Sequence, residues 1–422
     1  MKFNKKILKN GLKVITVPMK DNPTVTVLVM VEAGSKYETK EINGLSHFLE
    51  HMCFKGTTKR PKVIDISREL DGIGAHYNAF TSQEYTGYYA KADFKHLDML
   101  LGVVSDIYLN PVFNENEIEK EKGVIIEEIN MYEDLPHRKV QEIFMRLLYG
   151  DQPAGWDIAG TKENIRNLKR GDFLDYRQKH YVPSATTVVI AGKFDEKKIL
   201  GNIQKIWGNI FAGKKKGKAK TVESQRKPDI LLQHKDIDQT HIVLGVRSFD
   251  TYSKNNPAMR VLATALSGGM SSRLFQRLRD EMGICYYVRA ENDTYTDHGV
   301  LQVSAGLDNK RVKEGVIAIM EEFKRLKNEN ISENELNKVK QQLQGNLYLG
   351  LETSDSFAEY CGYQEVLKKP IKTPEQIIAE IQTVTVTDVK KIANKIFQDK
   401  NLNLAIIGRF KNKDEFLPIL KF

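Results

Sequence analysis

The feature that most constrains this chain is an internal repeat, in which the second half follows the pattern of the first. The segment "NENEIEKEKGVIIEEI" begins at Asn114, and a similar segment, "SENELNKVKQQLQGNL", follows 218 residues later, at Ser332. Two further segments, which begin at Thr161 and Thr373, each have the pattern of two helices followed by a strand that ends in Gly-Lys-Phe or Gly-Arg-Phe. Such self-similarity predicts that one supersecondary arrangement is built twice.

The two halves meet in a charged segment without apolar periodicity, "AGKKKGKAKTVESQRKP", which is typical of an exposed linker. In each half, alternating strand patterns come first and longer amphipathic helices follow them. A chain of 422 residues is also too long for one ordinary core. We therefore expect an α+β fold of two similar lobes that face each other across a cleft, each a mostly antiparallel sheet packed with helices. The predicted boundaries are 1–212 for the first lobe, 213–228 for the linker and 229–422 for the second lobe.

Composition and charge exclude several classes of protein. The chain is 41% hydrophobic and 28% charged, as globular proteins are, and no segment has the run of about 20 apolar residues that a membrane helix needs. The N-terminus has no apolar signal-peptide core, so we expect a cytoplasmic protein without a membrane partner. The net charge of +9 comes without a recognition motif, and we expect no nucleic-acid partner. The three cysteines form no C-x-x-C pair, which argues against a disulfide framework and a cysteine zinc site.

Residues 44–56, "GLSHFLEHMCFKG", place two histidines and a glutamate within five positions of a helical pattern. His47 and His51 are four residues apart, so on a helix both imidazoles project from one face and can bind one ion. Glu50 lies beside that ion, in the spacing H-x-x-E-H that inverts the H-E-x-x-H motif of zincins. Neutral imidazoles suit zinc, and a catalytic zinc needs a third protein ligand. The motif therefore predicts one Zn²⁺ per chain; the alternative is a half-buried helix whose histidines form ordinary hydrogen bonds.

The third ligand is expected on the acidic helix "NENEIEKEKGVIIEEINMYED". The apolar positions Ile118, Val124, Ile125 and Ile129 indicate its buried side, but periodicity alone does not choose among the carboxylates at 121, 127 and 128. Glu121 and Glu128 are seven residues apart, which is two turns along one face, whereas Glu127 points about 100° away. This spacing favours Glu121 and Glu128 as a pair that points inward and Glu127 as a surface residue.

Four segments together resemble one family: "GLSHFLEHMCFKGT", "GAHYNAFTSQEYTGYYAK", "EKEKGVIIEEI" and "SGGMSSRLFQRLRDEMGICYYV". In these segments the chain resembles the pitrilysin-type (inverzincin, M16) metallopeptidases. Within that family it resembles the shorter subfamily (M16B) of mitochondrial processing peptidase β subunits and their bacterial relatives. The resemblance covers nearly the whole chain in order, and a glutamate 77 residues after the second histidine of H-x-x-E-H is highly specific.

The resemblance implies a role for each matching residue. His47, His51 and Glu128 would bind zinc, Glu50 would be the general base, and Glu121 would support the site. Asn78 and Ala79 would lie on an edge strand that hydrogen-bonds the backbone of an extended substrate. In the second lobe, Arg279 and Tyr286 match an Arg–Tyr pair that closes onto the substrate, so that lobe would hold substrate rather than metal.

The expected function is that of a zinc-dependent endopeptidase that cleaves short or unfolded peptides in an extended conformation. Relatives of this length commonly pair two chains, so we expect either a homodimer or a heterodimer with an inactive paralogue. Two other classes remain as alternatives. One is a non-catalytic subunit that binds peptides or assembles with an active partner, and the other is a basic nucleic-acid-binding protein. The intact motif argues against the first of these, because silent members of the family usually lose part of it.

Overall fold

The computed structural model describes residues 1–210 and 212–422, and the chain divides into two compact units. The first unit consists of Met1–Ile129, Asp157–Ala219 and Leu349–Thr373, and the second consists of Asn130–Trp156, Lys220–Tyr348 and Pro374–Phe422. These units do not follow the division expected from the sequence at 1–212 and 229–422, because each half of the chain contributes one segment to the unit that is built mainly from the other half.

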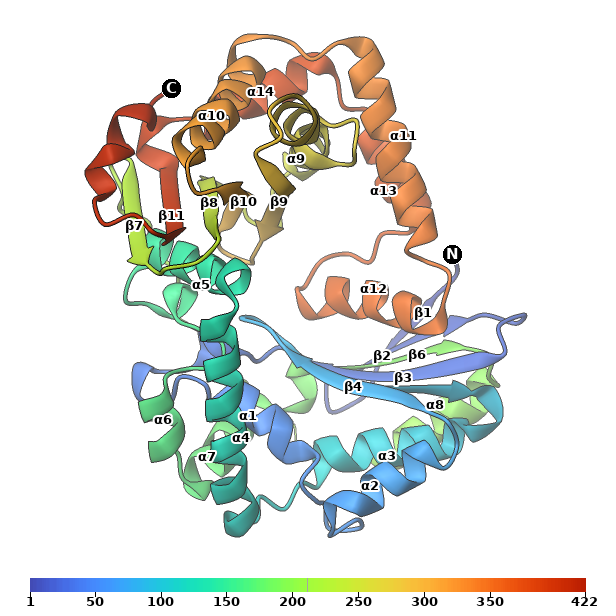
Figure 1. The fold of residues 1–422 in the computed structure, drawn as a ribbon. Helices are drawn as coiled ribbons and strands as arrows, with labels where there is room; N and C mark the ends of the chain where they lie inside the picture. Colours follow the sequence, from blue (N-terminus) through green and yellow to red (C-terminus); the bar gives the residue numbers. More distant parts are fainter. Residues whose placement is uncertain (211) are drawn as a thin grey trace. The chain divides into compact units, whose positions relative to one another are not determined.

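The first unit is built on a sheet with the strand order β1-β2-β6-β3-β5-β4 (Figure 1). Only the pair β2 and β6 is parallel. The strands are β1 (Asn4–Ile7), β2 (Lys13–Pro18), β3 (Thr24–Val31), β4 (His76–Thr81), β5 (Thr86–Asp93) and β6 (Thr186–Gly192). The helices are α1 (Leu45–Cys53), α2 (Val63–Asp71), α3 (Leu97–Leu109), α4 (Glu115–Asp134, which continues into the second unit), α6 (Lys162–Asn167), α7 (Arg170–His180), α8 (Glu196–Trp207) and α12 (Ser354–Val366).

The second unit is built on a sheet with the order β7-β11-β8-β10-β9, in which only β7 and β11 are parallel. The strands are β7 (Asp229–His234), β8 (Gln239–Ser248), β9 (Cys285–Thr294), β10 (Gly299–Asp308) and β11 (Leu402–Gly408). The helices are α5 (Pro136–Tyr149), α9 (Asn256–Ser267), α10 (Val312–Asn328), α11 (Glu333–Leu349), α13 (Pro374–Gln382) and α14 (Val386–Ile396). This order and direction match β2-β6-β3-β5-β4 of the first sheet. The α+β fold with two mostly antiparallel sheets is therefore confirmed.

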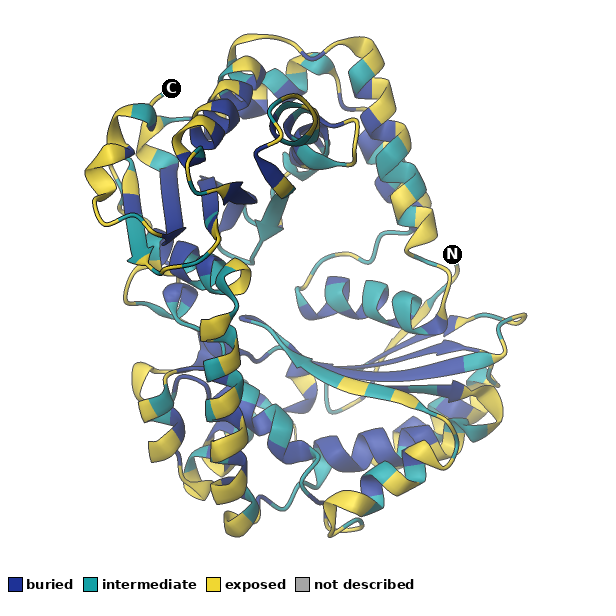
Figure 2. Ribbon diagram, in the orientation of Figure 1, coloured by how far each residue is buried: buried dark blue, intermediate teal, exposed yellow. Residues whose placement is uncertain are grey.

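Both faces of the first sheet are covered, which explains the almost unbroken apolar sequence "TVTVLVMV" of β3. Successive side chains of a strand point to opposite faces. Val27, Val29 and Val31 pack in one core with residues of α1, α3 and α7, whereas Leu28 and Met30 pack in a separate core with residues of α12. The inner strands β3 and β6 of the first sheet and β8, β10 and β11 of the second are accordingly coloured as buried along most of their length in Figure 2.

Each unit contains one helix that comes from the half of the sequence that mainly builds the other unit. Helix α5 comes from the first half of the sequence, yet its Val140, Ile143 and Phe144 pack with β8, β10 and β11 of the second sheet. Helix α12 comes from the second half, and its Ala358 and Cys361 pack on β2, β3 and β6 of the first sheet. The repeat is thus closed by an exchange of equivalent helices, since α5 and α12 each directly follow the long helices α4 and α11.

The charged segment between the halves has no helix or strand from residue 212 to residue 228. Two of its lysines are nevertheless held against the first unit: Lys215 pairs with Glu32, and the Lys218 Nζ atom lies 2.8 Å from the Glu84 Oε1 atom. Both lysine side chains are largely buried, whereas the sequence predicts an exposed segment throughout. Among the described residues, no helix combines the length and the apolar character needed to cross a membrane.

Candidate metal centre

Helix α1 presents the H-x-x-E-H motif on one side and a fully buried apolar stripe on the other. Leu45, Phe48, Leu49 and Met52 are buried in the core of the first unit, at positions spaced three and four residues apart. This stripe fixes the rotation of the helix. His47, Glu50 and His51 therefore lie together on the remaining face, where all three are half-buried.

The start of α1 is fixed by two residues that the sequence analysis did not single out. Gly44 has a φ of 101°, and a Cβ atom there would lie 2.6 Å from the backbone oxygen of Ala159, so only glycine fits. The buried Glu38 carboxylate accepts hydrogen bonds from the backbone N–H groups of Gly44 at 2.8 Å and Ser46 at 2.6 Å. Burial raises the pKa of Glu38 to about 7, although these donors oppose the shift. Glu38 thereby satisfies the N–H groups that every helix leaves unpaired at its start.

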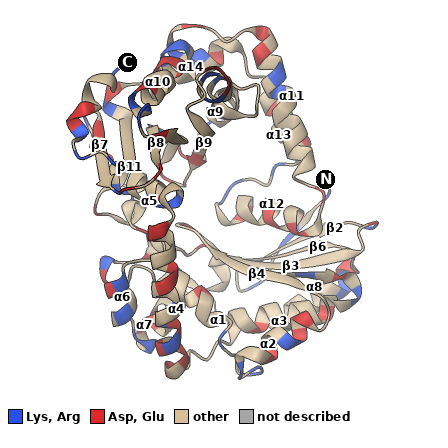
Figure 3. Cartoon of the chain, viewed as in Figure 1, with Lys and Arg blue, Asp and Glu red and all other residues tan. Residues whose placement is uncertain are grey.

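Helix α4 brings two carboxylates to α1 from about 70 residues further along the chain. Ile118, Ile125 and Ile129 are buried, and Glu121 lies on the same side with 4% of its surface exposed. Glu128 is half-buried and Glu127 is exposed. Val124 was expected to mark the buried side, but it is 51% exposed, because it lies about 100° around the helix from Ile125. Acidic residues run along much of this helix in Figure 3.

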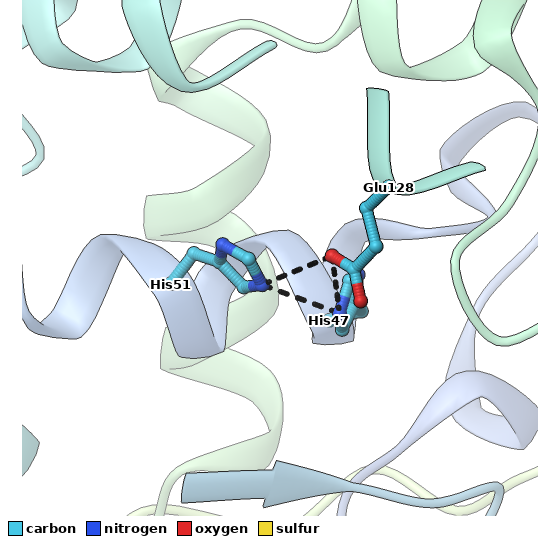
Figure 4. A group of neighbouring side chains, drawn as sticks. All are labelled: His47, His51 and Glu128. Atoms are coloured by element: carbon cyan, nitrogen blue, oxygen red, sulfur yellow. Dashed lines mark hydrogen bonds and ion pairs between the residues drawn. The ribbon is translucent and has the colours of Figure 1, made fainter. Parts of the chain in front are cut away.

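Three donor atoms converge where α1 and α4 meet (Figure 4). The His47 and His51 Nε2 atoms are 3.3 Å apart, and each lies 3.6 Å from the Glu128 Oε2 atom. A tetrahedral zinc site with bonds of about 2.0–2.2 Å places its donor atoms about 3.3–3.6 Å apart. The separations of these three atoms therefore fit one zinc ion without rearrangement. In the part of the chain that the structure describes, no other cluster of three His, Cys, Asp or Glu side chains has this geometry.

The two imidazoles differ in their surroundings. The His51 Nδ1 atom lies 2.9 Å from the Glu121 Oε1 atom, and since a carboxylate accepts, Nδ1 carries a hydrogen, which leaves Nε2 as the nitrogen that can bind a metal. Burial lowers the pKa of His51, but this hydrogen bond and the charges of Glu50 and Glu128 outweigh burial and raise it. Burial and the neighbouring His51 lower the pKa of His47, which keeps that imidazole neutral.

Glu50 lies next to the three donor atoms and is held by the first sheet. The Thr81 hydroxyl at the end of β4 donates a hydrogen bond of 2.5 Å to the Glu50 Oε2 atom. Burial raises the pKa of Glu50 above its ordinary value, while the Thr81 hydrogen bond opposes the shift. A carboxylate in such surroundings is a stronger base than one in water, so this arrangement suits proton transfer.

Comparisons with known proteins agree with this geometry. Residues 13–162 match the family model "Insulinase (Peptidase family M16)", and residues 167–343 match the model "Peptidase M16 inactive domain". The chain is 35% identical over 407 residues to "Uncharacterized zinc protease YmxG" of Bacillus subtilis, an alignment that covers 95% of this chain and 97% of that protein. This chain belongs to peptidase family M16.

Other M16 relatives and two solved structures extend the likeness. An "Uncharacterized zinc protease" of Rickettsia felis is 34% identical, with 96% of this chain and 97% of that protein covered. The crystal structure of a protease from Helicobacter pylori has a TM-score of 0.88 at 23% identity and covers 96% of this chain and 99% of that one. The crystal structure of a "peptidase M16 inactive domain" from Pseudomonas fluorescens also has a TM-score of 0.88, at 17% identity, and covers 97% of this chain and 99% of that one. These two structures share the M16 fold with this chain.

The edge strand expected from the M16 resemblance is β4, which pairs with β5 on one side only among the described strands. Asn78 and Ala79 lie in its middle, opposite Tyr89 and Tyr88 of β5. The exposed Asn78 accepts a hydrogen bond of 2.9 Å from the backbone N–H of Ala79. Thr81, the residue that holds Glu50, ends the same strand. The Thr81 hydroxyl thus connects the end of β4 to Glu50 of the candidate metal centre.

The other two residues expected from the M16 resemblance lie in the second unit and contact each other. Arg279 is in the π-helical turn η6 (Phe275–Glu281), and Tyr286 is at the start of β9. The Arg279 Nη1 atom donates a hydrogen bond of 3.1 Å to the backbone oxygen of Tyr286, and the guanidinium lies 5.0 Å from the centre of the tyrosine ring. The Tyr286 side chain is exposed. The pair is therefore pre-formed within its own unit.

Proposed function

We propose that this M16 family member is a zinc-dependent endopeptidase that cleaves extended peptides, in the manner of the processing peptidases that its sequence resembles. The observation that supports this most strongly is the convergence of His47, His51 and Glu128 at separations that suit one zinc ion, with Glu50 beside them. Two imidazoles and one carboxylate are also a common ligand set for catalytic zinc, and they leave a fourth position open.

Each residue of the centre has a role in this proposal. Bound between these ligands, zinc supplies a Lewis acid that makes water more acidic and polarises the carbonyl of the scissile bond. Glu50 accepts the proton of the attacking water and delivers it to the amine that leaves. Glu121 fixes the orientation of His51, and Thr81 fixes the orientation of Glu50.

Substrate binding is assigned to the free edge of β4. An extended peptide that adds to this edge as a further strand gains backbone hydrogen bonds at Asn78 and Ala79, and such bonds carry little sequence information. Arg279 and Tyr286 of the second unit are assigned to holding the bound peptide. We therefore expect substitutions of this pair to raise the KM for peptides and to leave zinc content unchanged.

The proposal is tested by comparing Glu50→Gln with the wild type in two assays, peptide cleavage and zinc content. Glu50→Gln is expected to keep one zinc per chain and to lose at least about 100-fold in kcat, because an amide cannot accept the proton. Glu127→Gln is the matched control, since Glu127 is an exposed glutamate on α4. Cleavage by Glu50→Gln at the wild-type rate would refute the role of the general base.

The same assays separate the main alternative, a non-catalytic subunit that only binds peptides. For such a subunit the wild type would bind zinc and peptide without cleaving the peptide, and addition of a chelator would leave the peptide equally intact. We also predict that two chains pair, as a homodimer or with an inactive paralogue, and that the protein is cytoplasmic. Light scattering of the purified protein tests for the homodimer, and mass spectrometry of the protein isolated from its cells tests for a second kind of chain.

A further inference from the structure

We propose that Lys55 is a positioning residue of the metal centre, which holds the Glu121 carboxylate in the one orientation that fixes the His51 imidazole. Lys55 lies outside the H-x-x-E-H motif, and its ammonium pairs with the Glu121 carboxylate. Its effect on the metal passes through Glu121. The inference rests on the proposed zinc site and deepens it, by adding a residue that tunes how tightly the site binds its metal.

The contacts form a chain of three side chains behind the site. The Lys55 Nζ atom lies 2.7 Å from the Glu121 Oε2 atom, and the Glu121 Oε1 atom lies 2.9 Å from the His51 Nδ1 atom. The two carboxylate oxygens are thus divided between the ammonium and the imidazole. Glu121 itself is 5% exposed in its side chain, so few water molecules can replace either partner.

The backbone around Lys55 is fixed against the segment that leads into α4. The N–H of Lys55 donates to the Met52 oxygen at 3.1 Å, and the N–H of Val112 donates to the Gly56 oxygen at 3.1 Å. Gly56 has a φ of 119°, and a Cβ atom there would lie 2.7 Å from the Pro61 oxygen. The turn after α1 is therefore rigid and is tied to the chain just before Glu115, where α4 begins. The Lys55 side chain therefore lies beside Glu121, and Glu121 is two turns of α4 away from Glu128.

A carboxylate needs both oxygens occupied to stay in one orientation, because it rotates about the bond that joins it to its side chain. With Lys55 on Oε2, the Glu121 Oε1 atom stays toward Nδ1 of His51, which keeps the hydrogen on Nδ1 and the lone pair of Nε2 toward the metal position. Glu121 is an acceptor for both partners, with the Lys55 ammonium at its Oε2 atom and the His51 Nδ1 atom at its Oε1 atom.

Removal of Lys55 should change the zinc affinity in the direction opposite to the one that charge repulsion alone predicts. A lysine near a cation site repels the cation, so its removal should tighten zinc binding if charge alone mattered. If Lys55 acts by holding Glu121, its removal should weaken zinc binding instead. Loss of a partner that orients a metal ligand typically weakens metal binding by about 10–100-fold.

The experiment measures the zinc dissociation constant of the full chain by competition with a chelator of known affinity, at one pH and one ionic strength. Lys55→Met is expected to weaken zinc binding by about 10-fold or more. Lys55→Arg keeps a cation that can donate to Oε2, and we expect it to restore most of the affinity. Lys120→Met is the matched control, because Lys120 is an exposed lysine of α4 that pairs with Glu117 at 2.7 Å.

A double substitution tests whether Lys55 acts through Glu121. In a Glu121→Gln background, Lys55→Met is expected to change the zinc dissociation constant by less than about twofold, because the carboxylate it would position is gone. Full additivity of the two substitutions would overturn the proposal, as would zinc binding by Lys55→Met that equals or exceeds that of the wild type. Circular dichroism verifies that each variant folds, and Lys55→Gln, with the same expected direction and a smaller loss, replaces Lys55→Met should that variant fail to fold.

The outcome also separates this inference from the proposed function. A wild-type protein that binds no zinc would refute the zinc site itself, and the role of Lys55 with it. A wild-type protein that binds zinc tightly, together with an unaffected Lys55→Met variant, would refute only the role of Lys55.

Discussion

The two long helices α4 and α11 occupy equivalent places in the repeat and differ in what they bury. At the repeat offset, Glu121 of α4 corresponds to Val339 of α11, and Glu128 corresponds to Asn346. Glu121 is 4% exposed and Val339 is 1% exposed. The fold therefore needs only an apolar side chain at this position, and a buried carboxylate there is costly unless it is paired. The difference supports a role of Glu121 in the proposed metal site rather than in the packing of the fold.

The helices that follow the equivalent strands β3 and β8 differ in the same way. Helix α1 carries two histidines and a glutamate opposite its apolar stripe. Helix α9, with the sequence "NPAMRVLATALS", contains neither a histidine nor a carboxylate and buries seven of its residues. One fold thus exists twice in the same chain, once with a polar cluster that suits a metal and once with apolar packing at the corresponding helices.

The largest effect is expected from Glu128→Asn, which gives the third ligand position of the first unit the residue found at the equivalent position of the second unit. Glu128→Asn should abolish tight zinc binding and reduce peptide cleavage to the background, because a neutral amide replaces the only anionic donor of the three. Elemental analysis after dialysis measures the metal, and Glu127→Asn is the control at the neighbouring exposed position. Retention of one zinc per chain by Glu128→Asn would show that Glu128 is not a ligand.

The reverse exchange tests the second unit. Val339→Glu should lower the free energy of unfolding by about 3 kcal/mol, because it places a carboxylate at a fully buried position. Urea denaturation measures the loss, and Val124→Glu is the control, since Val124 is an exposed valine of α4. The comparison of the two helices would fail if Val339→Glu were as stable as the control.

A smaller effect is expected when the buried carboxylate of the first unit is replaced by its apolar counterpart. Glu121→Val should weaken zinc binding by about 10–100-fold, because His51 loses the acceptor that orients it. The metal-free protein should lose no more than about 1 kcal/mol, since the partners left behind, Lys55 and His51, are partly exposed and can be hydrated. Chelator competition and urea denaturation of the same sample measure both. A large loss of stability with unchanged zinc affinity would assign Glu121 to packing instead.

The smallest effect is expected from the contact between β4 and the general base. Glu50 must be ionised to accept a proton, so activity is lost as the pH falls through its pKa. The Thr81 hydrogen bond lowers that pKa, and Thr81→Val should therefore move the acidic limb of the kcat/KM profile to higher pH. A hydrogen bond of about 1 kcal/mol corresponds to a shift of about 0.7 pH unit. Thr81→Ser keeps the hydroxyl and should keep the profile, whereas a downward shift in Thr81→Val would contradict this role.

Local patterns predict those parts of the molecule that short-range geometry controls. The duplication and the succession of strand and helix patterns in each half are visible in the sequence. The spacing of four between His47 and His51 puts both imidazoles on one face of α1, and the spacing of seven puts Glu121 and Glu128 on one face of α4. Val124 shows the limit of such reasoning, since an apolar residue beside a buried stripe need not be buried itself.

Contacts between distant segments leave no periodic signal. Lys55 meets Glu121, Thr81 meets Glu50 and Glu38 caps α1, and none of these pairs shares a helix face or a strand register with its partner. The exchange of α5 and α12 is equally hidden, because an amphipathic pattern gives a helix an apolar face without saying which sheet covers it. The lysines 215 and 218 likewise belong to a segment whose composition is typical of a linker, and only the fold reveals the buried carboxylates that hold them.

The most direct measurement is a zinc-edge anomalous difference map from crystals of the wild-type protein grown with equimolar zinc. We predict one strong peak in the first unit, bonded at about 2.0–2.2 Å to the Nε2 atoms of His47 and His51 and to an oxygen of Glu128. A peak at some other group of residues, or no peak among these three side chains, would contradict the account.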